Sequence, residues 1–293
     1  MTVPVAVPVR APARDAPAGR GEPAAGGAPS AWAPWSPCSP RCVAHSAARV
    51  SAGRVAGRTA AFTRSLLGAL LRAGRMSEPG ELRARAAAVL DALEVRLEVR
   101  GGPLSVPGRT GTLVVANHVS WLDILALLAV EPVTMLAKRE VGGWPVVGAL
   151  ARRAGTLFID RGSLRGLPDT VSTVSGRLRA GRSVMAFPQG VTWCAGTGGR
   201  FRRATFQAAI DAGAPVRPVT LEYVQHGVPT TVTAFVGDDD FGSSLRRVLG
   251  AGGLGVRVLI HEPLPTLPGA DDRRSLAIRA QDAVGGAEKS PHI

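Results

Sequence analysis

One histidine and one aspartate stand close together between two apolar runs. His118 and Asp123 are separated by five positions, with residues 112–116 before them and residues 124–130 after them. A short β-branched run, a polar turn and a longer apolar run predict a strand, a loop and a helix. An imidazole oriented by a carboxylate is a pair that can take a proton from a hydroxyl group. We therefore expect general-base chemistry at the carboxyl end of that strand.

The predicted helix start decides whether the two side chains can meet. On one continuous helix, residues five apart point about 140° away from each other and cannot pair. If Ser120 caps the helix, Asp123 takes the third helical position of a capping box and His118 lies in the loop before it. One ring nitrogen then faces Asp123 and the other remains available as a base. The alternative is a structural histidine beside an ordinary cap, which a short pattern alone would favour.

Three further blocks accompany the Asn117-His118 block. They are Gly-Thr-Leu-Phe-Ile-Asp-Arg at 155–161, Phe-Pro-Gln-Gly at 187–190 and Ala-Pro-Val-Arg-Pro-Val at 214–219. In order and spacing, the four blocks resemble those of the glycerolipid acyltransferase family, which includes 1-acylglycerol-3-phosphate acyltransferases. The resemblance covers about residues 95–285.

This resemblance implies an O-acyltransferase of phospholipid biosynthesis. Its acyl donor would be acyl-CoA or acyl carrier protein, and its acceptor the hydroxyl of a lysophospholipid, most simply 1-acylglycerol-3-phosphate. His118 would act as the general base, Asp123 would fix its tautomer, and Asn117 would orient the loop. No cofactor or metal is expected, because a thioester is already activated.

The acceptor-binding residues implied by the resemblance are Arg161, Gln189, Gly190 and Thr192. A guanidinium at the carboxyl end of a strand can hold a phosphate with two hydrogen bonds. From spacing alone, Arg161 would instead form a surface ion pair with Asp160. On the strength of the resemblance, we expect Arg161 to bind the acceptor.

The third block departs from the family pattern. The family usually has Phe-Pro-Glu-Gly-Thr-Arg, whereas this chain has Gln189 in place of the acid and Thr192 where arginine is often found. A glutamine can donate and accept hydrogen bonds, but it has no charge and cannot act as a base. Either the acceptor is bound differently, for example an ornithine-type lysolipid, or the protein binds lipid with impaired catalysis. If the acceptor is bound differently, the arginine cluster at positions 200, 202 and 203 would help to bind it, and the alternative for that cluster is a solvated loop.

The composition indicates which classes of molecule the protein binds. The chain has 293 residues, 45% of them hydrophobic, and a formal net charge of +13, which favours anionic partners such as phospholipid headgroups. Aromatic residues make up 4% and include one tyrosine, so base-stacking surfaces for nucleic acid are not expected. The three cysteines, Cys38, Cys42 and Cys194, form no disulfide framework. Cys38, Cys42 and His45 lack a fourth zinc ligand, so no metal site is predicted.

Strand and helix patterns alternate over about the last two thirds of the chain. Strand and helix patterns follow one another from residue 95 to a closing helix at 271–284, with a further strand expected at 230–236. This alternation predicts a single α/β domain over 95–286, with a mixed, largely parallel central sheet flanked by helices. Ligands of such sheets bind at the carboxyl ends of strands, where the four blocks fall.

Two segments precede the predicted domain. Residues 1–44 are rich in Pro, Ala and Gly and predict a disordered arm, and 287–293 is assigned to a tail. Residues 45–94 predict an amphipathic segment, with Val55, Phe62, Leu66 and Leu70 on one side and arginines on the other. It could lie in the headgroups of an anionic membrane or pack on the domain with a solvated basic face. No stretch is long enough to span a bilayer, so we expect peripheral association with the cytoplasmic face of the cell membrane.

Overall fold

The computed structural model describes residues 34–44, 48–160, 165–195, 198–267, 269 and 271–286. Most of the predicted arm and the predicted tail lie outside this part of the chain. Residues 34–44, which the sequence assigns to the arm, are packed: they contain the 3-10 helix η1 (Pro40–Cys42), and Val43 is buried. The packed part of the protein therefore begins before the segment that the sequence assigns to the amphipathic region.

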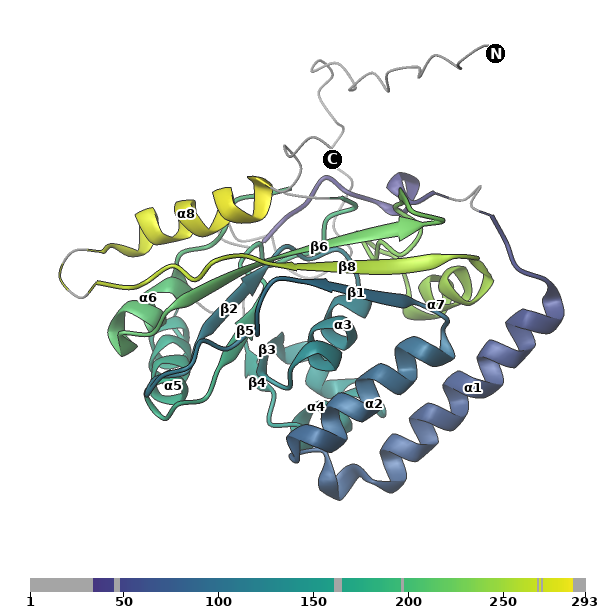
Figure 1. Ribbon diagram of the computed structural model, residues 1–293, viewed down its shortest axis with the longest axis horizontal. Helices are drawn as coiled ribbons and strands as arrows, with labels where there is room; N and C mark the ends of the chain where they lie inside the picture. The colour runs from purple at the N-terminus through teal and green to yellow at the C-terminus, as the bar shows by residue number, and fades with distance from the viewer. Residues whose placement is uncertain are drawn as a thin grey trace, which may run out of the picture. The chain divides into compact units, whose positions relative to one another are not determined.

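A mixed sheet forms the centre of the fold (Figure 1). Its strands run in the order β1-β8-β6-β2-β5-β3-β4, and β7 pairs with β6. The pairs that β6 makes with β8 and β7 are antiparallel, and the other pairs are parallel. The predicted mixed, largely parallel sheet is confirmed. The strands are β1 (Arg96–Arg100), β2 (Leu113–Ala116), β3 (Thr134–Lys138), β4 (Leu157–Ile159), β5 (Val184–Ala186), β6 (Val216–Gln225), β7 (Val228–Pro229) and β8 (Leu254–Ile260).

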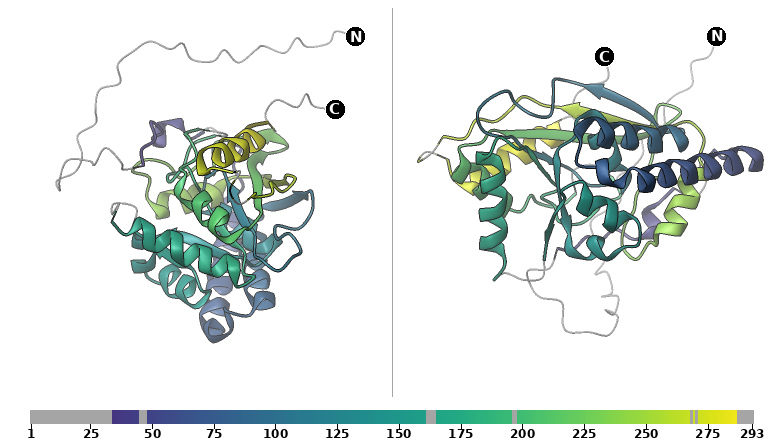
Figure 2. Two further views of the ribbon diagram at one scale, coloured as in Figure 1. Left: turned by 90° about the vertical axis from the view of Figure 1, so that its left-hand side faces the viewer. Right: turned by 90° about the horizontal axis from the view of Figure 1, so that it is seen from below.

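Helices cover both faces of the sheet, as two further views show (Figure 2). Along β2, Leu113 and Val115 pack into one apolar core, while Val114 and Ala116 pack into the other, because successive side chains of a strand alternate. The first core is covered by α5 (Leu167–Arg179), α6 (Ala204–Ala212) and α8 (Arg273–Gly286). The second is covered by α1 (Ala52–Leu71), α2 (Pro79–Ala92), α3 (Leu122–Val130) and α7 (Phe241–Gly250). The helix α4 (Val147–Arg153) precedes β4 and follows the 3-10 helix η3 (Arg139–Gly143).

Three parallel strands place the sequence blocks side by side. β2 lies between β5 and β6, with Val115 opposite Ala186 on one side and Ala116 opposite Val219 on the other. Parallel neighbours end at the same edge of a sheet, so the loops after β2 and β5 leave from adjacent points. The first and third blocks therefore meet, although they lie about 70 residues apart in the chain.

The strand predicted at 230–236 is not formed. Ala234 N–H bonds to the Thr231 carbonyl within a turn, and Phe235 N–H bonds to the carbonyl of Val119. The alternation of apolar residues is real, since Val232, Ala234 and Val236 are buried. The backbone groups, however, are satisfied by a turn and by the loop after β2 instead of a strand ladder.

The amphipathic segment packs on the domain through α1. Phe62 is buried, and α1 lies beside α2, with its start near α7 (Figure 1). Arg58, which the helical wheel assigned to the basic face, is also buried, and its guanidinium bonds to the carbonyls of Leu249 and Ala251. Among the described residues, no helix is long and apolar enough to cross a membrane.

Glu94 completes this anchor at the end of α2. Arg58 and Arg54 both reach its carboxylate, at 2.8 and 2.6 Å. Hydrogen bonds from Arg54 and then Arg58 lower the pKa of Glu94 to about 2. The sequence missed this role of Arg58 because a helical wheel does not show where carbonyl groups from a distant turn will lie.

Replacing Arg58 with alanine should lower the free energy of unfolding by about 1–3 kcal/mol, because buried carbonyls and Glu94 lose a charged donor. The matched control is Arg54→Ala, on the same helix and paired with the same carboxylate but exposed, which should lose clearly less stability than Arg58→Ala because solvent screens its ion pair. Urea unfolding followed by circular dichroism measures both. Equal losses would mean that Arg58 does not anchor α1.

Candidate active site

His118 and Asp123 face each other at the carboxyl end of β2. Nδ1 of His118 lies 2.7 Å from Oδ2 of Asp123. Asp123 is fully buried, whereas the His118 side chain keeps 17% of its surface exposed. The carboxylate therefore lies behind the ring, and the imidazole is the member of the pair that reaches solvent.

Asp123 is held by four hydrogen-bond donors. Its Oδ2 also accepts the backbone N–H groups of Val119 and Ser120, at 2.7 and 3.0 Å. Its Oδ1 accepts the Tyr223 hydroxyl at 2.5 Å. Burial, and then the neighbouring Asp123 charge, raise the pKa of Tyr223 well above its ordinary value, so this hydroxyl keeps its proton.

The tautomer of His118 follows from this arrangement. A carboxylate that receives donors on both oxygens acts as an acceptor toward the ring, so Nδ1 must carry the proton that it shares with Asp123. Nε2 is then left with a lone pair. An imidazole in this state can accept a proton from an alcohol.

The start of α3 departs from the predicted capping box, because Trp121 and not Ser120 is the N-cap and makes no side-chain cap hydrogen bond. The helix begins at Leu122, one residue later than a Ser120 cap would place it. Ser120 N–H still bonds back to the Asp123 carboxylate, and Ser120 Oγ accepts the N–H of Leu122 at 3.3 Å. His118 lies in the incoming loop and folds back, as the spacing required.

Residues of the third block fix the imidazole ring. Phe187 stacks on His118, with ring centroids 3.9 Å apart and planes inclined by 12°. The carbonyl of His118 accepts the N–H of Trp193 at 2.8 Å. The ring and its backbone are thus held from the loop that follows β5.

Gln189 joins the first block to the loop after the third. Its Oε1 accepts the His118 N–H at 2.8 Å, and its Nε2 donates to the carbonyl of Gly198. Only 4% of its surface is exposed. Glutamate could accept the first bond but could not, when ionised, donate the second. Glutamine is therefore the residue type that satisfies both backbone groups here.

Asn117 and Thr192 also contact backbone groups. Asn117 is fully buried and exchanges two hydrogen bonds with Leu221, at 2.8 and 2.9 Å, which ties the end of β2 to β6. Thr192 Oγ donates to the carbonyl of Phe235. The structure thus gives Asn117, Gln189 and Thr192 positions that shape the loops around His118.

Gly190 and Arg202 form the part of this loop that faces the packed N-terminal segment. Gly190 has φ of +82°, and a Cβ there would lie 3.0 Å from Pro34 and 3.2 Å from Nε of Arg202. The N–H of Arg202 bonds to the carbonyl of Pro188. Arg161 lies outside the described residues, and its neighbour Asp160 pairs with Arg139 at 3.8 Å.

The sequence did not identify Tyr223 or Phe187 as parts of the site. Phe187 opens the third block, but its stacking depends on the adjacency of β2 and β5. Tyr223 is the one tyrosine in the chain and lies in the strand that continues from the fourth block, which was a usable signal. Among the described residues, the only cluster of three or more possible metal ligands lies apart from this pair, at Cys38, Cys42 and Cys194.

Comparisons with known proteins identify the family to which the chain is similar. Residues 96–222 match a family model described as Acyltransferase. The chain is 41% identical over 177 residues to a lyso-ornithine lipid O-acyltransferase of Pseudomonas aeruginosa, covering 60% of this chain and 67% of that protein. It is 40% identical over 171 residues to a 1-acyl-sn-glycerol-3-phosphate acyltransferase of Neisseria meningitidis, covering 58% and 66%.

The fold has a solved counterpart. The crystal structure of the 1-acyl-sn-glycerophosphate acyltransferase PlsC from Thermotoga maritima superposes with a TM-score of 0.55 at 21% identity. The superposition covers 73% of this chain and 81% of that one. At this identity the likeness concerns the fold.

Glutamate at position 189 should destabilise the protein in a pH-dependent way. A buried carboxylate facing the Gly198 carbonyl favours its protonated form, which raises its pKa in the folded state. The loss of stability should therefore appear above about pH 4.3, the value for exposed glutamate, and grow as the pH rises.

Melting temperatures of Gln189→Glu and wild type at pH 5 and 8 test this, with Thr173→Glu, which adds a carboxylate at an exposed position of α5, as the control. A variant as stable as the wild type at both pH values would show that the donor to Gly198 is dispensable.

Proposed function

The chain belongs to the acyltransferase family that includes the lysolipid acyltransferases, and from this premise we propose that it moves a fatty acyl group from an acyl thioester to the hydroxyl of 1-acylglycerol-3-phosphate. The observation that supports this most directly is the His118–Asp123 pair, with Nδ1 occupied by the carboxylate. No acyl-enzyme intermediate is needed. The acyl donor is acyl-CoA or acyl carrier protein, and the chemistry requires no cofactor or metal.

In the proposed reaction His118 is the general base. Nε2 takes the proton of the acceptor hydroxyl as its oxygen attacks the thioester carbonyl, and the C–S bond then breaks. The thiolate leaves and recovers the proton from the imidazolium, so one ester and one thiol are formed. Asp123 stabilises the transient positive charge on the ring, and Tyr223 and two backbone N–H groups keep that carboxylate in place.

We assign headgroup binding to the arginines near the third block. The Arg202 guanidinium lies against Gly190, which directly follows the residue bonded to the His118 N–H. Arg161 is retained as a second phosphate ligand on the strength of the sequence resemblance. Arg200 and Arg203 are also exposed close by in the chain. The net charge of +13 favours an anionic acceptor.

A second acceptor, a lyso-ornithine lipid, is favoured by one specific observation. The third block has Gln189 and Thr192 instead of the usual acid and arginine, and both side chains bond to backbone groups. A relative at 41% identity is named for that lipid. By contrast, impaired catalysis has less support, because Gln189 preserves the geometry around His118.

The protein associates peripherally with the cytoplasmic face of the membrane in this proposal. Leu67 and Leu71 are exposed on the second half of α1, at 54% and 88%. Arg64, Arg72 and Arg75 are exposed on or just beyond the same helix. Apolar side chains next to arginines suit an anionic lipid surface that supplies the acceptor.

Loss of the base should nearly abolish acyl transfer. We expect His118→Ala to lower kcat for lysophosphatidic acid about 10²–10⁴-fold, the usual contribution of a general base. Thiol release in the presence of acyl-CoA and the acceptor measures the rate. His226→Asn is the control, because His226 is exposed in the turn after β6 and has a positive φ that asparagine tolerates. Equal rates for His118→Ala and wild type would rule out the mechanism.

The acceptor can be identified by direct competition. Wild type offered lysophosphatidic acid and lyso-ornithine lipid together should form mainly phosphatidic acid, scored by mass spectrometry. Arg202→Gln should raise KM for lysophosphatidic acid about 10-fold or more with little change in kcat, because a charge-assisted bond to phosphate is lost. Arg109→Gln is the control, because Arg109 is exposed in the loop before β2, at the opposite end of that strand from His118. Exclusive acylation of lyso-ornithine lipid would overturn the phosphate acceptor and leave the reaction type standing.

A further inference from the structure

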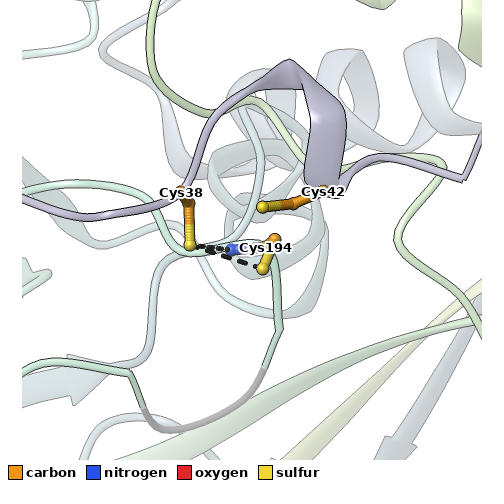
Figure 3. Close-up of side chains that lie close together, drawn as sticks. All are labelled: Cys38, Cys42 and Cys194. Carbon is orange, nitrogen blue, oxygen red and sulfur yellow. Dashed lines mark hydrogen bonds between the residues drawn. The ribbon is translucent and has the colours of Figure 1, made fainter. Parts of the chain in front are cut away.

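Three cysteines converge beside the loop of the third block (Figure 3). Cys38 lies two residues before η1, and Cys42 is the last residue of η1. Cys194 follows the third block, 156 positions after Cys38. All three sulfur atoms lie within 4.8 Å of one another. Cys38 Sγ lies 3.3 Å from Cys194 Sγ and accepts the Cys194 N–H at 3.4 Å.

The packing of the N-terminal segment holds this convergence in place. Val43 is buried in the core, and Ala44 N–H bonds to Thr231 Oγ at 2.8 Å. Before η1, Gly237 has φ of +64° and a Cβ there would lie 3.0 Å from the Cys38 carbonyl, so glycine is the residue that fits this close approach without strain. The segment is thus fixed on both sides of η1, and the thiols meet as a consequence.

The spacing and surroundings suit a borderline-soft divalent cation. Zinc–sulfur bonds of about 2.3 Å in a tetrahedral site place sulfur atoms roughly 3.8 Å apart, within the range that these three already span. Cys38 and Cys194 are partly buried, whereas Cys42 is exposed. Three thiolates this close would repel one another, and a cation offsets that repulsion.

We propose that Cys38, Cys42 and Cys194 bind one Zn²⁺ ion through three thiolates, with solvent at the fourth position on the exposed Cys42 side. The sequence counted only Cys38, Cys42 and His45; the fold supplies Cys194, while His45 lies outside the described residues. Binding releases the thiol protons, and the ion has no part in acyl transfer.

The ion ties residues 38–42 to the loop that supports the base. Trp193, next to Cys194, donates its N–H to the His118 carbonyl. Thr192, two residues before Cys194, donates to the carbonyl of Phe235, and the N–H of Phe235 donates to the carbonyl of Val119. Zinc here acts as a structural link that positions the third block, and because it binds the folded chain it raises stability.

Metal analysis of the full-length chain tests the proposal. The protein is purified under a phosphine reductant without chelators, and zinc is measured by mass spectrometry. We expect about one zinc per chain in the wild type and in Ser39→Ala, a control in the same segment. Cys38→Ser, Cys42→Ser and Cys194→Ser should each lose it. Zinc retained by all three cysteine variants would overturn the proposal.

Cobalt titration of the wild type tests the metal site without the cysteine variants, whose folding the substitutions could impair. Reduced, metal-free wild type should take up one equivalent of Co²⁺ with thiolate-to-cobalt charge-transfer absorption, and Zn²⁺ should displace it. A chelator should lower the melting temperature of the zinc-loaded wild type. Reduced, folded wild type that binds neither metal would overturn the proposal. A purified wild type that contains a Cys38–Cys194 disulfide, and that binds no metal after the disulfide is reduced, would also overturn the proposal.

Discussion

The buried carboxylate of Asp123 is the interaction on which the rest of the site depends. A charge that is removed from water must be satisfied by donors, and here the donors come from three directions: the imidazole, two loop N–H groups and the Tyr223 hydroxyl. Three of the four donors lie on the loop between β2 and α3, and the fourth, Tyr223, lies on β6. The carboxylate therefore fixes the position of the loop relative to the sheet and fixes the His118 tautomer at the same time.

The parallel arrangement of β5, β2 and β6 makes these contacts possible. Because the three strands end at one edge, the loop carrying His118 lies between the third block and the far half of β6. Asn117 bonds to Leu221 on one side, and Gln189 bonds to the His118 N–H on the other. Hydrogen bonds to backbone groups therefore hold the loop that carries His118 on both sides, which fixes the position of the imidazole.

Local patterns in the sequence predicted the fold class and the pairing of His118 with Asp123. Alternating strand and helix patterns are set by neighbouring residues, and the cap that turns His118 back lies within six residues. What could not be predicted depends on distant chain segments. Arg58 is buried because Leu249 and Ala251 present carbonyls to it, and the alternating 230–236 segment is a loop because Val119 accepts its N–H. Likewise Cys194 meets Cys38 only after the N-terminal segment folds over the third block.

The departure in the third block is best understood as a choice between two hydrogen-bond patterns. A glutamate at position 189 would add a charge beside the His118 backbone, but it would leave the Gly198 carbonyl facing an acceptor. Glutamine gives up that charge and closes the loop with two bonds. The electrostatic stabilisation of the imidazolium then comes from Asp123, whose carboxylate accepts four hydrogen bonds. Positioning of the loop and charge stabilisation are in this chain divided between Gln189 and Asp123.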